Sequence, residues 1–326
     1  MKLMKFIAPI IAVLVVTVAT PVTEALAAPQ KKKTERAPKA KKTTAAKKSP
    51  RVARAARAAP KARAMTYEDV AEADSRFLRS TAVLVQDQAS GAVLFEKNSD
   101  AILPIASITK LMTAMVVLDA RQDLDESLTI SEEDIDTMRG SRSRLRVGAE
   151  LSREDMLRLA LMSSENRAAS ALSRHYPGGD DAFVAAMNHK AHALGLTDTR
   201  FRDPTGLNAG NVSSARDLVK LVAAASHYPL IRAMSTAPEY TVDLGGRPKT
   251  FHNTNALVSN PAWEISVSKT GFINESGKCL VMQAWLNSKP TIIVLLDSWG
   301  RLTRIGDANR IKKWLENASL QQADSS

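Results

Sequence analysis

Three short motifs contain the residue types that a serine acyl-transfer site requires. In chain order they are Ser107-Ile108-Thr109-Lys110, Ser164-Glu165-Asn166 and Lys269-Thr270-Gly271. A serine hydroxyl becomes a nucleophile when a neighbouring base removes its proton, and a neutral lysine can act as that base. Each motif alone is weak, because a Ser-x-x-Lys tetrapeptide occurs by chance in many proteins. Their order and local contexts together predict acyl transfer.

The first motif lies where a helix is expected to begin, after Pro104. Ser107 is then close to a helix N-terminus, where unpaired backbone N–H groups favour a developing oxyanion. Lys110 returns to the same helical face, so its ammonium nitrogen can approach the Ser107 hydroxyl. Its pKa must fall through burial or a neighbouring cation before it acts as a base, and Lys269 is the candidate cation. The alternative is a capping serine beside a solvated lysine.

The second motif ends the apolar stretch 157–162. Polar side chains in such a setting need partners. We expect Ser164 to relay a proton to a leaving amine and Asn166 to bond Lys110 or a substrate carbonyl. An ordinary polar helix junction is the alternative.

The third motif closes a strand predicted over 265–269. Gly271 leaves room for another backbone to approach, which suits an extended peptide lying along this sheet edge. Lys269 and Thr270 are expected to hold an anionic carboxylate by charge and hydroxyl. A plain turn is the alternative.

The elements that position these motifs predict a mixed α/β domain. The strand-like runs are 81–85, 92–95, 265–269, 280–286 and 291–296. Besides the helix after Pro104, helical patterns lie near 153–175, 181–194, 215–225 and 308–318. Strands at both ends with helices between them predict an antiparallel sheet whose first and last strands pair, flanked by a helical cluster. Ile311, Trp314 and Leu315 are expected to pack the last helix on that sheet.

Two segments precede this domain, which we assign to residues 65–326. Residues 1–27 have a basic start, an apolar run over 6–19 and a small-residue cleavage site at Ala25-Leu26-Ala27, which predicts a secretory signal and a periplasmic protein. The apolar run has 14 residues, fewer than the roughly 20 that span a bilayer, and an uncleaved anchor is the alternative.

Residues 28–64 carry most of the net charge. With 14 lysines or arginines against Glu35 they contribute +13, and the signal adds +1, so residues 65–326 carry −3 of the chain's net +11. Almost no apolar residue is present to form a core, which predicts a disordered arm. Charge alone would fit nucleic acid, but an exported protein favours an anionic envelope polymer; a spacer is the alternative.

Metal and cofactor chemistry have little support. His189 and His192 share a helix face but lack a carboxylate or cysteine at ligand spacing. Phosphate-loop and dinucleotide fingerprints are absent from the sequence. Cys279 is the single cysteine and lies in an apolar run, so we expect a buried, inert thiol.

The motifs and their flanking blocks resemble the low-molecular-mass penicillin-binding proteins, serine D,D-peptidases related to class A β-lactamases. Within them, the chain is most similar to periplasmic D-alanyl-D-alanine endopeptidases. The resemblance covers about residues 66–318 and rests on three blocks: Pro104 to Ala114, Leu161 to Ala168, and Asp203-Pro204-Thr205-Gly206-Leu207.

This resemblance implies a β-lactamase/transpeptidase-like fold and a cofactor-free site. Ser107 would be the acylated nucleophile, Lys110 its base, and Ser164 and Asn166 the proton relay and orienting group. Lys269 would bind the substrate carboxylate. The backbone N–H groups of Ser107 and Phe272 would form the oxyanion hole. Arg301 is a further candidate for the carboxylate, although no motif contains it.

The resemblance also implies peptidoglycan stem peptides as substrate and β-lactams as covalent inhibitors. Only 55 residues follow Gly271, too few for the β-rich domain and amphipathic anchor of related D,D-carboxypeptidases. We therefore expect an endopeptidase without a C-terminal membrane anchor, with a D,D-carboxypeptidase or a non-catalytic envelope-binding protein as alternatives. No deacylating glutamate can be assigned, so slow, inhibitory acylation by penicillin is expected.

Overall fold

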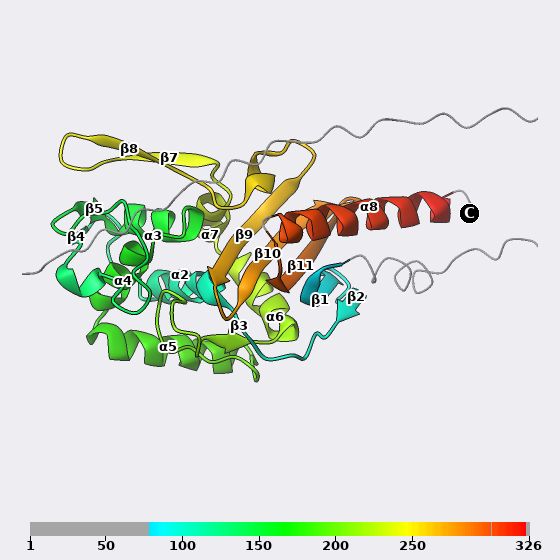
Figure 1. Ribbon diagram of the computed structural model, residues 1–326, viewed down its shortest axis with the longest axis horizontal. Helices are drawn as coiled ribbons and strands as arrows, with labels where there is room; N and C mark the ends of the chain where they lie inside the picture. Colours follow the sequence, from blue (N-terminus) through cyan, green and yellow to red (C-terminus); the bar gives the residue numbers. More distant parts are fainter. Residues whose placement is uncertain (1–77, 301, 324–326) are drawn as a thin grey trace, which may run out of the picture. The chain divides into compact units, whose positions relative to one another are not determined.

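The computed structural model describes residues 78–300 and 302–323. The predicted signal (1–27), the basic arm (28–64) and Arg301 lie outside the described residues. The central element is a five-stranded antiparallel sheet with the strand order β2-β1-β11-β10-β9 (Figure 1). Its strands are β1 Ser80–Asp87, β2 Val93–Lys97, β9 Glu264–Ile273, β10 Gly277–Leu286 and β11 Lys289–Ser298.

The pairing of β1 with β11 confirms that the first and last strands of the domain meet. Leu84 lies opposite Val294 in this ladder. Side chains of β1 alternate between two separate cores: Ala82 and Leu84 face the helical cluster, and Val83 and Val85 face the other side. Because successive residues of a strand point to opposite faces, a run of apolar residues indicates a sheet covered on both sides.

The helix α8, Thr303–Ala323, covers the second face of the sheet (Figure 1). Ile311, Trp314 and Leu315 are buried there, as predicted, and the Trp314 ring packs edge-on against Phe95 at a centroid distance of 6.3 Å. The helix is longer at both ends than the predicted 308–318.

The helical cluster lies beside the first face and carries two of the three motifs (Figure 1). It consists of α2 Lys110–Asp119, α3 Arg153–Met162, α4 Asn166–Arg174, α5 Gly179–Ala193, α6 Ala215–Ala225 and α7 Pro229–Ser235. Side-chain caps fix two of the helix starts, where Ser152 and Ser214 accept hydrogen bonds from the backbone N–H groups of Asp155 and Asp217. α2 is buried over most of its length, so the first motif belongs to the core.

The prediction of a single helix over 153–175 is wrong, because two helices with a break between them occupy this segment. α3 ends at Met162 and α4 begins at Asn166, with Ser164 between them at φ +62°. A left-handed non-glycine residue cannot continue a helix. The chain turns here and presents Ser164 from a loop and Asn166 from the first turn of α4.

Several short elements were not predicted. The two-stranded pairs are β3 Leu103–Pro104 with β6 Val212–Ser213, β4 Ser127–Thr129 with β5 Glu150–Ser152, and β7 Glu239–Asp243 with β8 Pro248–His252. The 3₁₀ turns are η1 Ala106–Thr109, η2 Glu132–Asp134 and η3 Ala256–Ser259. Within the described residues, no helix has the length and apolar character needed to cross a membrane.

Candidate active site

Ser107 and Lys110 lie at the junction of η1 and α2. The Lys110 Nζ donates to the Ser107 Oγ at 2.9 Å, which confirms that the two side chains share one face. Ala106, immediately before the serine, has φ +47° although it is not a glycine. Left-handed backbone costs about 1–3 kcal/mol at a non-glycine residue, so the surrounding packing must hold this turn in place.

The Lys110 side chain is fully buried and has three acceptors. Besides Ser107, its Nζ donates to the Asn166 Oδ1 at 2.8 Å and to the Thr205 carbonyl at 2.6 Å. Burial lowers the pKa of Lys110 to about 7, against the opposing charges of Asp203 and Glu165. A burial penalty of this kind disfavours the charged ammonium, so the neutral amine is accessible near neutral pH.

Lys269 lies on β9 and is also almost completely buried. Its Nζ donates to the Ser164 Oγ at 2.9 Å and to the Thr270 carbonyl at 3.2 Å. Burial, followed by the charges of Lys110 and Arg304, holds the pKa of Lys269 well below its usual range. Of the two causes predicted for a lowered pKa of Lys110, burial or the neighbouring Lys269, burial is the one that acts at Lys110, and the repulsion between the lysines depresses the pKa of Lys269.

The loop between α3 and α4 connects the two lysines. Ser164 contacts Lys269 and Asn166 contacts Lys110, while the Asn166 Nδ2 donates to the Ser141 Oγ at 3.0 Å. Glu165 points away from these groups, accepting a hydrogen bond from the Ser143 hydroxyl at 2.7 Å. The motif thus presents alternate side chains to the site, which the sequence pattern alone did not distinguish from a helix junction.

Two glycines allow backbone segments to approach the serine. A Cβ at Gly271 would lie 2.8 Å from the Ile105 carbonyl oxygen and 3.2 Å from the Ser107 nitrogen. A Cβ at Gly206, where φ is +82°, would lie 2.0 Å from the Ala106 carbonyl oxygen. The close approach predicted for Gly271 is therefore present, but the neighbouring backbone is η1 of the same chain.

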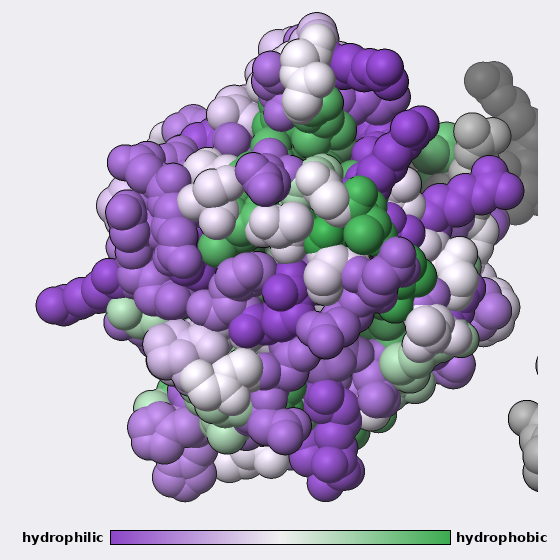
Figure 2. Space-filling view, turned by 90° about the vertical axis from the view of Figure 1, so that its left-hand side faces the viewer, coloured by the Kyte–Doolittle hydropathy of each residue, from purple (hydrophilic) through white to green (hydrophobic). Residues whose placement is uncertain are grey.

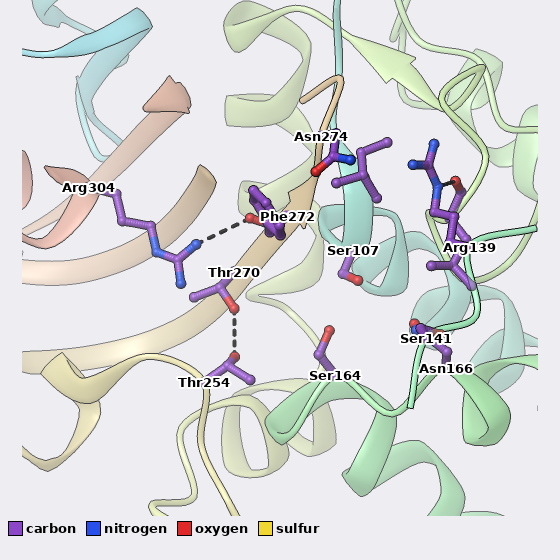
Figure 3. A pocket seen from close by; sticks show the side chains of 13 residues that line it. Ser107, Arg139, Ser141, Ser164, Asn166, Thr254, Thr270, Phe272, Asn274 and Arg304 are labelled. Atoms are coloured by element: carbon purple, nitrogen blue, oxygen red, sulfur yellow. Dashed lines mark hydrogen bonds between the residues drawn. The ribbon is translucent and has the colours of Figure 1, made fainter. Parts of the chain in front are cut away.

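These groups surround a pocket of about 450 Å³ (Figure 3). Figure 3 shows the Ser107 and Ser164 side chains facing one another across it, with Thr270 beside them. The Thr270 hydroxyl donates to Thr254 Oγ1 at 2.6 Å, and Phe272, with 57% of its surface exposed, forms part of the rim. Lys110 and Lys269 are covered beneath the lining. The lining residues are Ser107, Arg139, Ser141, Ser164, Asn166, Leu207, Thr254, Thr270, Gly271, Phe272, Ile273, Asn274 and Arg304.

Sequence reasoning missed several residues of this pocket. Arg304 lines it three positions after the predicted Arg301 and donates to the Gly271 carbonyl at 3.2 Å, and burial lowers the pKa of its guanidinium. Arg139 spans the opposite side, with both Nη atoms 2.9 Å from carboxylate oxygens of Glu275 in the β9–β10 turn. No motif or periodicity marks these arginines; their place depends on the folded loops.

The loop at Asp203 was recognised only as a sequence block. Its carboxylate accepts backbone hydrogen bonds from Thr205, Gly206 and Asn208 at 2.5–2.6 Å. This turn aims the Thr205 carbonyl at Lys110. An aspartate that precedes Pro-Thr-Gly is a turn signal, and this signal could have placed the loop in sequence analysis.

Other candidate groups remain outside the site. Cys279 is buried as predicted, and burial raises the pKa of its thiol to about 11. In the part of the chain that the structure describes, no group of three or more His, Cys, Asp or Glu residues could hold a metal ion. The chemistry of the pocket is that of hydroxyls, amines and backbone N–H groups.

Comparison with known proteins gives consistent matches. Residues 69–299 match the family model described as D-alanyl-D-alanine carboxypeptidase, peptidase family S11. The D-alanyl-D-alanine endopeptidase of Pseudomonas aeruginosa is 53% identical over 245 residues, covering 74% of this chain and 79% of that protein.

Solved structures agree with the sequence matches. The crystal structure of a Streptomyces DD-transpeptidase superposes with a TM-score of 0.68 at 29% identity, covering 73% of this chain and 97% of that chain. Penicillin-binding protein D2 of Listeria monocytogenes, in its cefotaxime-bound form, superposes with a TM-score of 0.66 at 28% identity, covering 73% and 97%. The predicted β-lactamase/transpeptidase-like fold is confirmed.

Proposed function

The chain belongs to the serine D-alanyl-D-alanine peptidase family S11, and we propose that it is a D,D-endopeptidase that hydrolyses D-alanyl cross-links of peptidoglycan. One observation carries this proposal: a buried lysine with a pKa of about 7 bonds the hydroxyl of a serine that opens onto the pocket. We assign Ser107 as the nucleophile and Lys110 as its base.

The acylation step follows from this geometry. Lys110, in its neutral form, takes the Ser107 proton as the Oγ attacks the D-alanyl carbonyl carbon. The backbone N–H groups of Ser107 and Phe272 are assigned to the resulting oxyanion, and the close packing of η1 on β9 at Gly271 supports this pairing. The C–N bond then breaks, and the leaving amine receives the proton from Lys110 or through Ser164.

Deacylation completes the reaction. Water attacks the carbonyl carbon of the Ser107 ester, and its proton passes to Lys110. The C–O bond to Ser107 then breaks, Lys110 returns the proton to the Ser107 Oγ, and the shortened peptide leaves. Glu165 is bonded to Ser143 and lies 3.8 Å from the Arg144 Nε, so it is poorly placed to activate this water. This supports slow turnover of acyl-enzymes formed with β-lactams, and the cefotaxime-bound relative supports β-lactam binding.

Lys269, Thr270 and Arg304 form the proposed carboxylate site. Lys269 is almost completely buried, Arg304 is half-buried, and the Thr270 hydroxyl opens onto the same pocket. Neither Lys269 nor Arg304 forms a salt bridge with another described residue, so an anion that enters this pocket would supply a counter-charge, which strengthens its binding.

The choice of endopeptidase over carboxypeptidase rests on the Pseudomonas relative, because the motifs serve both reactions. Incubation with a purified cross-linked muropeptide dimer, followed by chromatography, tests it. We expect monomers to appear, and none to form with Ser107→Ala. Release of terminal D-Ala from pentapeptides while dimers persist would make the protein a D,D-carboxypeptidase instead.

We further propose that residues 65–326 are the catalytic domain and that residues 1–27 direct the chain to the periplasm. The substrate assigned to the site, a cell-wall peptide, supports an envelope location. An N-terminal sequence of the protein purified from cells would test the signal. A mature chain beginning near residue 28 agrees with this assignment, whereas an intact Met1 in the exported fraction contradicts cleavage.

A further inference from the structure

A second hollow, of about 910 Å³, lies between the segment 143–150 and the β7–β8 hairpin. We call it the basic groove. Its charged lining residues are Arg144, Arg146, Glu150, Arg247 and Lys249. Figure 2 shows this end of the molecule: hydrophilic side chains predominate on the face, and strongly hydrophilic ones flank the projection at its top, where Figure 1 places the β7–β8 hairpin.

The positive charge of the groove is local and largely uncompensated. Four cationic side chains and one carboxylate line it, and of the four only Arg144 has a salt-bridge partner among the described residues, Glu165, although residues 65–326 together carry a formal charge of −3. Within residues 78–300 and 302–318, no carboxylate forms a salt bridge with Arg146, Arg247 or Lys249. Like charges gathered without partners repel one another, so the arrangement favours an anionic ligand.

The basic groove adjoins the active-site pocket. Ser141 lines the pocket and Ser143 lines the groove, and two residues of chain span at most about 7 Å. Arg144 connects the parts of the groove: its guanidinium lies 3.9 Å from the centre of the Phe251 ring, and its Nη1 donates to the Thr250 carbonyl at 3.2 Å. The Arg144 Nε lies 3.8 Å from Glu165, the neighbour of Asn166 in the second motif.

We propose that the basic groove binds the free carboxylates of the second stem peptide in a cross-linked dimer. This inference rests on the proposed endopeptidase function. A monomeric substrate ends close to the scissile bond, whereas a dimer continues beyond it with further carboxylates. A cationic surface next to the pocket therefore gives the enzyme an attraction that only the longer substrate can use.

The test compares two double variants with the same change in net charge. Arg247→Glu with Lys249→Glu reverses the groove, and Arg200→Glu with Lys313→Glu reverses two exposed cations outside the lining of either hollow. For the groove variant we expect KM for the peptide dimer to rise about fivefold or more at low salt, with a smaller effect at high salt. Its rate of acylation by benzylpenicillin should stay within twofold of the unsubstituted protein.

A binding experiment tests this inference independently of the endopeptidase assignment. The groove and control substitutions are each combined with Ser107→Ala, so that the substrate can bind without being cleaved. In this background, a fluorescent peptide dimer should bind the groove variant about fivefold more weakly than the parent, and the control variant like the parent. A dimer with amidated carboxylates should bind the groove variant and its parent equally. If the native dimer binds all three proteins alike, or if the control loses as much affinity as the groove variant, the inference is wrong. Failure of the protein to cleave any dimer would instead contradict the endopeptidase assignment.

Discussion

At the residue scale, the proposed mechanism gives two buried lysines different roles. In that mechanism Lys110 must be neutral to accept the Ser107 proton, and Lys269 must be charged to attract a carboxylate. The structure places both ammonium groups out of solvent, and Asn166 and Ser164 give each lysine a separate partner. In the free protein, burial and then the charges of Lys110 and Arg304 hold the pKa of Lys269 well below its usual range. A carboxylate bound beside Lys269 would act in the opposite direction, because an opposite charge favours the protonated amine.

The acylation rate should depend on pH through Lys110. Because only the neutral amine is a base, and its pKa is about 7, the rate of acylation by benzylpenicillin should rise about tenfold from pH 5 to pH 6 and level off above pH 8. Stopped-flow measurement of acyl-enzyme formation, with circular dichroism to confirm folding at each pH, checks this. A rate that rises only above pH 9 would mean that Lys110 keeps an ordinary lysine pKa.

Lys269→Gln should slow acylation by ligands that carry a free carboxylate more than acylation by ligands that lack one. A charge-assisted hydrogen bond in a buried site contributes about 1.5–3 kcal/mol, so acylation by benzylpenicillin should slow about 10–100-fold. The methyl ester of benzylpenicillin lacks the anion, and its already slower acylation should change less than threefold. An equal loss for acid and ester would show that Lys269 supports the site by packing and not by charge.

Sequence reasoning reached these residues because fixed spacing within each motif reports local geometry. It placed Lys110 beside Ser107 and named burial or the neighbouring Lys269 as possible causes of a lowered Lys110 pKa, but it could not choose between them, since burial cannot be read from a tetrapeptide. Arg304 and Arg139 were missed because tertiary structure cannot be read from local spacing either. Each lines the pocket from a loop or a helix end whose position depends on contacts with residues far along the chain.

At the element scale, the site exists because η1 is held between β9 and the loop at Asp203. Gly271 permits the first contact and Gly206 the second. The break between α3 and α4 then directs Ser164 and Asn166 to different lysines. The predicted continuous helix failed at this break because apolar residues resume at Ala168, after five polar residues that are themselves compatible with a helix. The left-handed backbone of Ser164, which ends α3, is not visible in that pattern. The β7–β8 hairpin had a usable signal, the Gly245-Gly246 turn between two short strands, that was not read.

Gly206→Ala should therefore destabilise the fold strongly. The added Cβ would overlap the Ala106 carbonyl, and φ +82° adds its own penalty, so we expect a loss of about 2–5 kcal/mol in the free energy of unfolding. Gly91→Ala is the matched control, because φ is +76° there and the Cβ would meet open space; it should cost about 1 kcal/mol. Urea denaturation compares them, and equal losses would contradict the assigned close contact.

At the scale of the whole molecule, positive charge is concentrated in the N-terminal arm, and the rest of the chain is weakly acidic. Residues 28–64 carry +13, and residues 65–326 carry −3 with a local excess of cations in the basic groove. The charge composition therefore predicted the basic arm but not the basic groove, because a few clustered cations do not show in the net charge of residues 65–326. The overall sheet was predictable, since apolar strands near both ends of the domain leave few ways to cover one antiparallel sheet.

Deletion of residues 28–64 should leave catalysis unchanged and weaken binding to the cell wall. The truncated protein should cleave soluble muropeptide dimers at the rate of the full chain, because every residue assigned to the site lies beyond residue 100. Its sedimentation with purified cell-wall sacculi should fall several-fold at low salt, and the difference should shrink as ionic strength increases. Undiminished sedimentation would leave the arm as a spacer.

The central claim is the covalent chemistry of Ser107, and intact-mass analysis after incubation with benzylpenicillin tests it most directly. We predict a mass increase of one benzylpenicillin per chain, located by peptide mapping on the segment that contains Ser107. Ser107→Ala should remain folded and show no increase. Folded protein that gains no mass, or an adduct that persists in Ser107→Ala, would contradict the acyl-enzyme mechanism.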